Sequence, residues 1–362
     1  MSQHIDYIFL NGRKISFEQI REKSIEHLSS YEQKVIDFYT QWLCEQSSFE
    51  LSTSGSTGVP KKITLSRIQL IESATQTINF LNLKPGETML TCLNCQYIAG
   101  IMMLVRGLVG EMENHVVTPS SSPLENFHYK IDFTALVPLQ LQEILHHSKE
   151  HITKIKKIII GGAPIPKTLE EIIHLLPEEI TCYQTFGMTE TVSHFAMRNI
   201  SKKENHYTTL SDVQIDISDE NCLMVWTPVT KKWIQTNDIV ELCDQNTFKW
   251  LGRKDHVINS GGIKLFPESI ESEISSFFQE NRFIISSEPH PILGEQLILI
   301  LEKDLDRTQL KELIFSLKKN LPKYWKPKKI YATHDAFEET SSGKLDRINT
   351  LKLNKKVLYI ID

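Results

Sequence analysis

The sequence predicts an α/β protein, with a large layered domain of mixed sheets and a small C-terminal α+β domain joined to it by a hinge. Apolar runs of strand length alternate with helical stretches through most of the chain, up to about residue 250. From about residue 256 a new succession of strand-like and helical segments begins, which indicates a second domain. The 362 residues, 40% of them apolar, suffice for about two domains. We expect a core domain at 1–252 and a mobile C-terminal domain at 256–362.

Continuous apolar runs predict buried strands in the large domain, and longer periodic stretches predict helices. The expected strands are 88–93, 133–137, 157–161, 180–183 and 222–227, and the expected helices include 67–81 and 139–148. In the small domain a short strand at 257–258 precedes a Gly-Gly turn, and Pro267 opens a helix at 267–278. The module is completed by strands at 282–287 and 296–302 and by an amphipathic helix at 307–320.

Composition excludes several classes of protein. The net charge is −5, which argues against a general binder of nucleic acids or acidic membranes. No stretch approaches the roughly 20 apolar residues of a membrane span, and the first residues do not have the pattern of a secretory signal. We therefore expect a soluble cytoplasmic protein.

The six cysteines are scattered, unlike a disulfide framework. Cys92 and Cys95 form one CxxC, but no second Cys/His pair stands at the spacing of a zinc site. Cys92 also lies in an apolar, strand-like run. Buried thiols are therefore favoured over a metal or redox site.

A segment rich in Ser, Thr and Gly is the strongest local signal. Residues 52–59 contain only these three types and one Val. Glycines allow bends that turn backbone N–H groups toward an anion, and hydroxyls and a lysine add donors, so the segment suits a polyphosphate. A flexible linker is the alternative, but the strand-like KITLS that follows favours an ordered loop. The candidate phosphate ligands are Ser54, Gly55, Ser56, Thr57, Gly58 and Lys61.

Two further segments follow expected strands. In YQTFGMTET, Phe186 offers a flat face and Gly187 a close backbone approach, while Thr189 and Glu190 supply the hard oxygens that suit Mg²⁺ bound with substrate phosphates. The small residues of GGAP at 161–164 leave a slot for a planar ring at the carboxyl end of a strand.

Two more segments carry charged groups. Asp238 in TND and Arg253 in GRKD are natural partners for ribose hydroxyls and phosphate. The turn-like SSGKLDR at 341–347 presents Lys344. Each of these segments, taken alone, is also typical of an ordinary turn or surface pair.

Taken together and in order, the five segments resemble the signature motifs of the adenylate-forming superfamily, which includes acyl-CoA synthetases, adenylation domains and luciferase. STSGSTGVPKK resembles its phosphate loop, and TFGMTE resembles its YGxTE motif with Phe186 in place of Tyr. TND is similar to TGD, with Asn237 in place of Gly. GRKDHVINSGGIKLFPESIE and SSGKLDR are similar to the hinge motif and the final lysine motif. The resemblance covers roughly residues 50 to 350.

The resemblance implies an AMP-forming acid–thiol ligase that uses ATP, Mg²⁺ and CoA. The serine-rich segment would hold the β- and γ-phosphates, Thr189 the α-phosphate and Glu190 the Mg²⁺. Asp238 and Arg253 would bind the ribose, and Lys344 would stabilise the adenylate as it forms. The residues implied to border adenine are Gly162, Ala163, Pro164, Phe186 and Gly187. Asp255 is implied as the hinge, and the loop implied to line the CoA tunnel is Ser260, Gly261 and Gly262.

The segment 93–106 is similar to the acyl pocket of o-succinylbenzoate–CoA ligases of menaquinone biosynthesis, and so is GMTETxS at 187–193. Tyr97, Gly100 and Arg106 match the first pattern, and Thr191 and Ser193 would contact the second carboxylate or the ketone. An arginine in an apolar helix is costly unless paired, and a dianionic aromatic acid would supply the partner. The alternatives are that Arg106 reaches the surface or pairs with Glu111 or Glu113.

Several alternatives remain open from sequence. The enzyme could use another aryl or short acyl acid, or load a carrier protein, and a non-catalytic nucleotide-binding protein is the alternative from a different class. The phosphate loop comes early for the superfamily, so we expect a reduced N-terminal part and a sheet face that a homodimer could cover. The lysines 323, 326, 328 and 329 either meet a CoA phosphate or form a solvated face. Histidines such as His194 have no evident Ser or Cys partner, and we assign most of them no role.

Overall fold

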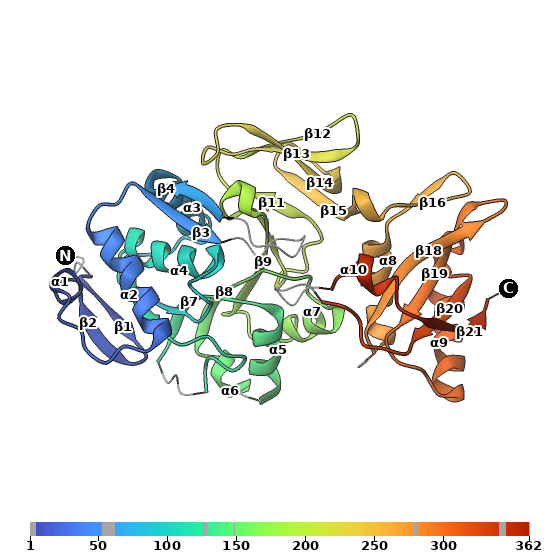
Figure 1. Ribbon diagram of the computed structural model, residues 1–362, viewed down its shortest axis with the longest axis horizontal. Helices are drawn as coiled ribbons and strands as arrows, with labels where there is room; N and C mark the ends of the chain where they lie inside the picture. Colours follow the sequence, from blue (N-terminus) through green and yellow to red (C-terminus); the bar gives the residue numbers. More distant parts are fainter. Residues whose placement is uncertain are drawn as a thin grey trace.

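The structure is a computed structural model that describes residues 5–52, 62–125, 127, 129–147, 149–278, 281–339 and 345–361. A large α/β domain and a smaller domain with its own sheet lie side by side, which confirms the predicted fold class (Figure 1). In the described part of the chain the large sheet has 13 strands and the small-domain sheet has six. The N-terminus lies at the far end of the large domain and the C-terminus at the far end of the small one (Figure 1).

The centre of the large sheet is parallel. Its strands, in spatial order, are β1 (Tyr7–Leu10), β6 (Glu113–Val116), β5 (Thr88–Thr91), β7 (Ile131–Leu136), β8 (Ile155–Ile160) and β9 (Thr181–Gly187). Strand β2 (Arg13–Ser16) pairs antiparallel with β1 at one edge. Beyond β9 the sheet continues antiparallel through β10 (His194–Asn199), β11 (Tyr207–Thr209), β15 (Thr247–Arg253), β14 (Trp233–Leu242), β13 (Cys222–Trp226) and β12 (Gln214–Ile217).

Helices cover both faces of the parallel strands. On one face α5 (Pro138–His147) and α7 (Lys167–Ile173) pack with Ile158 and Ile160 of β8. On the other face Met103 of α4 (Ile98–Val109) packs with Phe133 of β7. Helix α4 lies against α3 (Arg67–Phe80), and α2 (Ser30–Leu43) packs in the same cluster. Two short helices, α1 (Phe17–Glu22) and α6 (Lys149–Ile152), complete the domain.

The helix starts follow from capping chemistry. Ser29 before α2 and Ser66 before α3 each form a capping box with the residue three positions later, Glu32 and Gln69. Helix α3 is preceded by β4 (Lys62–Ser66), which pairs antiparallel with β3 (Ser48–Ser52). Ser52 lies opposite Lys62, and β4 is the strand that the KITLS pattern predicted.

The small domain begins after the short 3₁₀ turn at Lys254–His256, where β15 of the large sheet has ended. Its strands are β16 (Ile258–Ser260), β17 (Ile263–Leu265), β18 (Phe283–His290), β19 (Gly294–Leu301), β20 (Lys329–Thr333) and β21 (Lys355–Ile360). Its helices are α8 (Pro267–Ile274), α9 (Arg307–Asn320) and α10 (Arg347–Thr350). Helix α9 has the predicted bounds. Helix α8 is shorter than predicted, because a 3₁₀ turn at Ser275–Phe277 replaces its last turn.

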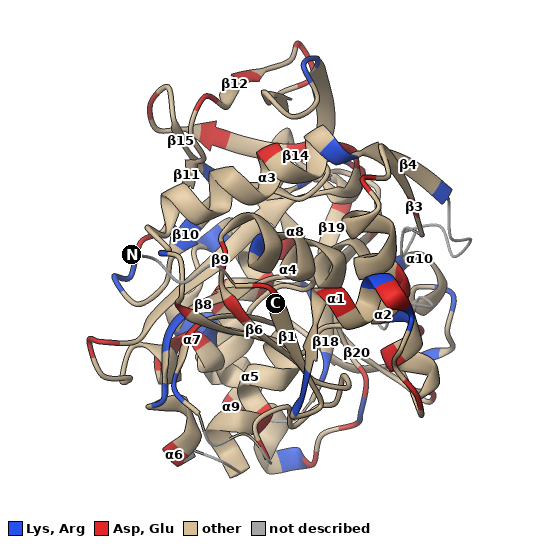
Figure 2. Ribbon diagram, turned by 90° about the vertical axis from the view of Figure 1, so that its left-hand side faces the viewer, with Lys and Arg blue, Asp and Glu red and all other residues tan. Residues whose placement is uncertain are grey.

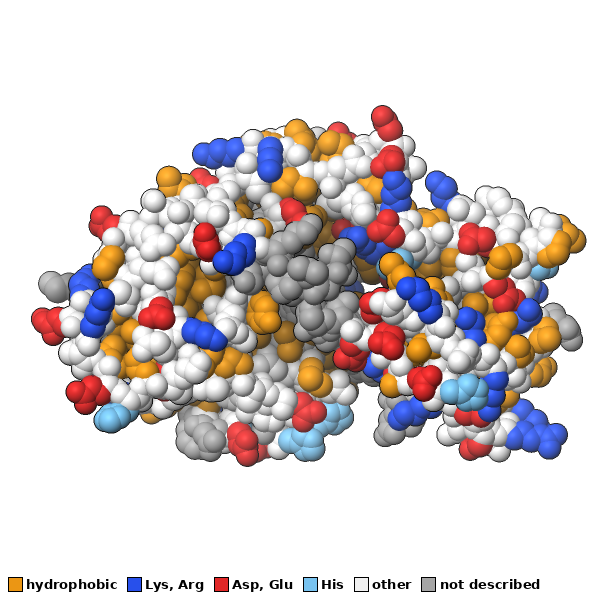
Figure 3. Space-filling view, in the orientation of Figure 1, with side chains coloured by type: hydrophobic (Ala, Val, Ile, Leu, Met, Phe, Trp, Pro, Cys, Tyr) orange, Lys and Arg blue, Asp and Glu red, His pale blue; other side chains and the backbone are white. Residues whose placement is uncertain are grey.

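The surface view agrees with a divided molecule. A notch separates the two lobes in Figure 3, below the centre of the view. Acidic and basic residues are interspersed over the face in Figure 2 rather than gathered by sign. Among the described helices, none combines the length and the apolar character needed to cross a bilayer.

Candidate active site

The carboxyl ends of β8 and β9 bring two of the predicted segments together. Ile160 of β8 lies opposite Gln184 of β9, and the Thr185 hydroxyl donates to the Ile160 carbonyl at 3.2 Å. The GGAP segment that follows β8 therefore starts beside the strand that carries Phe186 and Gly187. This is the place expected for a ligand at the carboxyl edge of parallel strands.

Phe186 is half-buried in an aromatic cluster. Its ring centroid lies 5.6 Å from that of Phe195, 5.1 Å from that of Tyr207 and 5.2 Å from that of Phe248. These contacts fix the plane of the ring. At Gly187 a Cβ atom would lie 2.3 Å from the His194 Cα, so only glycine lets β9 and β10 approach so closely.

The turn after β9 places the predicted hydroxyl and carboxylate groups. Thr189 and Glu190 begin a 3₁₀ turn, and the Glu190 side chain is exposed. The hydroxyl of buried Thr191 lies 2.9 Å from the Met188 carbonyl and 2.8 Å from the Ser193 carbonyl, so it is engaged within the turn. Val192 is buried and has φ of 69°, an unusual conformation for a β-branched residue. Such strain persists only where its surroundings enforce it.

Arg106 is a buried charge on α4. Its side chain is 2% exposed, which excludes the alternative that it reaches the surface. Its Nη2 donates to the Ser193 hydroxyl at 3.2 Å, and its Nη1 lies 3.6 Å from the Met103 sulfur. Among the described residues, no atom forms a hydrogen bond with its Nε and no carboxylate forms an ion pair with its guanidinium. Burial lowers the pKa of Arg106 to about 9, so the guanidinium stays charged at neutral pH.

Glu113 does not neutralise this charge. Its two carboxylate oxygens are bonded instead to the Tyr7 hydroxyl, at 2.7 Å, and to His115 Nε2, at 3.0 Å. The structure thus joins two residues predicted separately, Arg106 and Ser193, and leaves one buried guanidinium nitrogen, Nε, without a partner among the described residues. Arg106 is the kind of group that binds a carboxylate.

The other two acyl-pocket candidates lie toward the N-terminal end of α4. Tyr97 is the N-cap residue and is 42% exposed. At Gly100 a Cβ atom would lie 2.5 Å from backbone atoms of Asn94, so the packing of the preceding loop by itself requires glycine there. Nine residues of helix separate Tyr97 from Arg106, about 13 Å along the axis. Their part in an acyl pocket stays a prediction.

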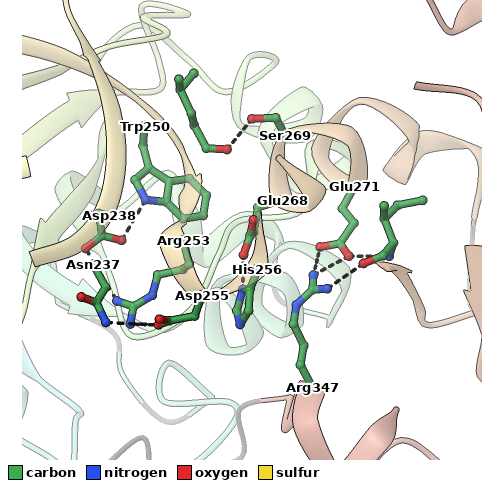
Figure 4. A network of polar contacts seen from close by, with 12 residues as sticks. Asn237, Asp238, Trp250, Arg253, Asp255, His256, Glu268, Ser269, Glu271 and Arg347 are labelled. Atoms are coloured by element: carbon green, nitrogen blue, oxygen red, sulfur yellow. Dashed lines mark hydrogen bonds and ion pairs between the residues drawn. The ribbon is translucent and has the colours of Figure 1, made fainter. Parts of the chain in front are cut away.

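Asp238 and Arg253 face each other on neighbouring strands β14 and β15 (Figure 4). The Arg253 Nη1 lies 3.8 Å from Asp238 Oδ2, and Trp250 Nε1 donates to Asp238 Oδ1 at 3.0 Å. Burial raises the pKa of Asp238, although the Trp250 and Arg253 contacts act in the opposite direction. Asp255 accepts from Asn237 at 3.2 Å and from Arg253 at 3.4 Å, so the predicted hinge residue is tied to the same pair.

Further contacts tie α8 to its surroundings at the domain boundary (Figure 4). Ser269 donates to the Leu251 carbonyl of β15, and Glu268 contacts His256. Glu271 of α8 forms an ion pair with Arg347 of α10. In Figure 1, α10 lies on the side of the small domain that faces the large one, whereas the β16–β17 hairpin projects away from the large domain. The predicted CoA-tunnel residues Ser260, Gly261 and Gly262 belong to this hairpin.

Two predicted groups lie outside the described residues: the phosphate-loop residues Ser54, Gly55, Ser56, Thr57, Gly58 and Lys61, and the lysine Lys344. The described strands and bridge that flank them are paired, β3 with β4 and Glu339 with Leu345.

Comparison with known proteins assigns the family. The model of the family described as AMP-binding enzyme matches residues 48–225. The crystal structure of an acyl-CoA synthetase (AMP-forming)/AMP-acid ligase II-like protein from Dyadobacter fermentans is 38% identical, with a TM-score of 0.63 over 91% of this chain and 96% of that one. The chain belongs to the AMP-forming acyl-CoA synthetases. Membership of this adenylate-forming family confirms the resemblance drawn from the motifs, and it makes the protein an acid–thiol ligase.

Two further relatives have names that specify the acid on which they act. The 2-succinylbenzoate–CoA ligase of Listeria monocytogenes is 25% identical over 91% of this chain and 74% of its own length. The o-succinylbenzoate CoA synthetase of Bacillus subtilis, solved with its acyl-adenylate intermediate, is 24% identical and superimposes with a TM-score of 0.72 over 86% of this chain and 70% of that one. The latter likeness establishes the acyl-CoA synthetase fold alone.

Sequence reasoning missed two members of the polar cluster beside Arg106, His194 and Thr77. His194 has the Ser193 hydroxyl at 3.4 Å from its Nδ1 and the Thr77 hydroxyl at 3.1 Å from its Nε2. The adjacent serine is visible in the sequence, but Thr77 is 117 residues away. Only the packing of α3 on β10 could have revealed it.

Proposed function

We propose that this acyl-CoA synthetase activates o-succinylbenzoate: it adenylates one carboxylate with ATP and Mg²⁺, then transfers the acyl group to CoA with release of AMP, as a step of menaquinone biosynthesis. The observation that carries the proposal is the buried Arg106: the described residues supply neither a hydrogen-bond partner for its Nε nor a carboxylate that neutralises its charge. A fatty acid would leave this charge unpaired, whereas an acid with a second carboxylate would pair it. The names of the two ligase relatives support the same substrate.

In the first half-reaction, a carboxylate oxygen of the substrate attacks the α-phosphorus of ATP, and the bond from that phosphorus to pyrophosphate breaks. Asp238 and Arg253 would hold the ribose, and the GGAP segment and Phe186 would border adenine. Lys344 and the serine-rich segment would neutralise the phosphates. In the second half-reaction, the CoA thiol attacks the acyl carbonyl carbon and AMP leaves. We propose Asp255 as the pivot that lets one site serve both steps.

Glu190 fits the expected Mg²⁺ chemistry. Its carboxylate is exposed, forms no ion pair with a described cation, and follows the hydroxyl of Thr189. Mg²⁺ is usually held by one or two carboxylates together with substrate phosphates, where it neutralises charge on the phosphate oxygens. No group of three or more His, Cys, Asp or Glu among the described residues suits a self-contained metal site, which accords with an ion shared with the nucleotide.

The test is CoA-dependent AMP release with four acids: o-succinylbenzoate, benzoate, succinate and a medium-chain fatty acid. We expect turnover of o-succinylbenzoate above the others. Replacing Arg106 with Ala should raise KM for o-succinylbenzoate about 10- to 100-fold and leave KM for ATP nearly unchanged, because a hydrogen bond to a charged group contributes about 1.5–3 kcal/mol. Preference for a monoacid in the wild type, or unchanged diacid kinetics in the variant, would overturn the substrate assignment.

A further inference from the structure

We propose that half-buried Ser193 and His194 and buried Thr77 form a hydrogen-bond chain that orients the Arg106 guanidinium for the second carboxylate of the acyl substrate. The inference rests on the proposed function and deepens it, because it assigns positioning residues behind the group that recognises the substrate. His194 and Thr77 do not touch the reacting atoms. They act through Ser193 and Arg106.

The chain crosses three elements. Arg106 Nη2 of α4 is 3.2 Å from the Ser193 hydroxyl in the turn before β10. That hydroxyl is 3.4 Å from Nδ1 of His194, the first residue of β10, and His194 Nε2 is 3.1 Å from the Thr77 hydroxyl of α3. The Thr77 hydroxyl in turn reaches the Ser73 carbonyl, at 3.2 Å.

One arrangement of hydrogens satisfies every member. Arg106 donates to Ser193, Ser193 donates to His194 Nδ1, His194 Nε2–H donates to Thr77, and Thr77 donates to the Ser73 carbonyl. In the opposite tautomer two donors converge on the Ser193 oxygen, whose own hydrogen then has no acceptor among the described residues. We assign the Nε2–H tautomer, because it alone gives every hydrogen of the network an acceptor within the described residues.

This arrangement requires a neutral imidazole. Burial, and then the positive charge of Arg106, hold the pKa of His194 well below its ordinary value. A protonated ring would donate from both nitrogens and would add a second charge beside the guanidinium. The neutral ring instead accepts from Ser193, which leaves the Ser193 lone pairs for Arg106.

The consequence is a guanidinium that is held before substrate arrives. Ser193 anchors Nη2 and the Met103 sulfur contacts Nη1, so Nε, the guanidinium nitrogen without a partner among the described residues, has a fixed direction. Val192 strengthens this, since its left-handed backbone and buried side chain fix where the turn delivers Ser193. A prearranged donor spares the ordering cost that a flexible arginine would incur on binding.

Helix α3 offers a matched pair of variants for the test. Thr75 and Thr77 both lie on α3 and both donate to the carbonyl four residues earlier, but only Thr77 contacts His194. We expect Thr77→Val to raise KM for o-succinylbenzoate about three- to tenfold, and His194→Phe about tenfold, with kcat and KM for ATP within about twofold of wild type. Thr75→Val should match the wild type. His194→Gln, which keeps an acceptor and a donor, should recover most of the loss.

A merely structural role predicts something different. It would lower kcat or raise KM for ATP along with KM for the diacid, or would make Thr75→Val and Thr77→Val alike, and either result overturns the proposal. A double-mutant cycle sharpens the test: in an Arg106→Met background, His194→Phe should have no further effect on KM for o-succinylbenzoate.

One readout does not depend on the substrate. Nitrogen-15 NMR of the wild-type imidazole should report a neutral Nε2–H tautomer of His194 from about pH 6 to 8. The two proposals can fail separately. Turnover of monoacids alone would overturn the substrate assignment. The hydrogen-bond chain would still be supported if the Nε2–H tautomer is present and the free energies of unfolding show coupling between Arg106 and His194. An imidazolium, or the Nδ1–H tautomer, overturns the chain whichever acid is used.

Discussion

At the scale of single residues, the site holds groups that weaken the fold. Arg106 places an uncompensated charge in an otherwise apolar helix, and Asp238 is a carboxylate that is only 9% exposed. Burying a charge without a full set of partners opposes folding. Both residues are therefore explained better by ligand recognition than by stability.

Replacing Arg106 with Met should stabilise the protein while it weakens diacid use. The substitution removes a buried charge and keeps an unbranched chain of similar length, so the free energy of unfolding should rise by about 1–4 kcal/mol. Urea denaturation of both proteins measures this. A less stable variant would mean that the Ser193 and Met103 contacts outweigh the cost of burial.

Replacing Asp238 with Asn should also stabilise the protein at neutral pH, and the gain should shrink in acid. Burial raises the pKa of Asp238 in the folded state, so folded wild-type protein binds this proton more tightly than the unfolded chain does. The wild type therefore gains stability relative to the variant as the pH falls through the raised pKa toward the unfolded value. Denaturation of both proteins from pH 7 to pH 4 tests the sign. A gap that widens in acid contradicts it.

At the scale of elements, the turn between β9 and β10 organises the site. Gly187 ends β9, and Val192 and Ser193 lie in the turn itself. Each has a distinct geometric requirement: a close approach at Gly187, a positive φ at Val192 and a contact with Arg106 at Ser193. The sequence pattern predicted the residues of this turn but not its strain, because φ depends on packing that the pattern does not contain.

A pair of substitutions isolates the strain at Val192. Val192→Ala removes the buried side chain but keeps a Cβ at φ of 69°, whereas Val192→Gly removes both. Ordinarily glycine is less stable than alanine by about 0.5–1 kcal/mol, but here the order should reverse, with glycine ahead by roughly 1 kcal/mol. Urea midpoints of the two variants decide the sign. Both should bind the diacid less tightly, since Ser193 is no longer held as firmly.

Strands that are buried on both faces of the sheet were predicted correctly from the sequence. The runs around β5, β7, β8 and β13 are continuous and apolar, and the structure confirms a strand in each place. Strand β14 was missed because WIQTNDIVEL alternates in burial and carries four polar residues in succession. The β1–β2 hairpin was also missed, although Asn11-Gly12 between two short strands is a strong hairpin signal.

At the scale of the whole molecule, a polar contact between two helices joins the large and the small domain. Lys167 of α7 and Glu273 of α8 form an ion pair across the domain boundary, at 3.6 Å, and both side chains are well exposed. The sequence predicted two domains, because a new succession of strand-like and helical segments begins near residue 256. It could not predict how they face each other, because that contact joins residues more than a hundred positions apart.

Reversing the charge of Lys167 should disfavour this arrangement of the domains. Lys167→Glu should slow ATP–pyrophosphate exchange about two- to fivefold, since exposed pairs contribute up to about 1 kcal/mol. The double variant with Glu273→Lys should restore the rate. Lys232→Glu, at an exposed lysine for which the described residues supply no ion pair, serves as the control. Failure of the double variant to recover would argue that the ion pair does not influence the domain arrangement.

The position of β1 in the large sheet has a consequence for the order of events on the ribosome. Phe9 and Leu10 pair with His115 and Val116 of β6, which is synthesised roughly 5 to 20 s later at typical elongation rates. Until then the β1–β2 hairpin can only exist as an isolated pair of strands, which is marginal in water. Its apolar side chains, Ile8, Leu10 and Ile15, are buried in the finished protein but must wait exposed in the nascent chain. Strand β1 is thus made well before the strand on which it docks, and a chaperone can meet its apolar side chains during that interval.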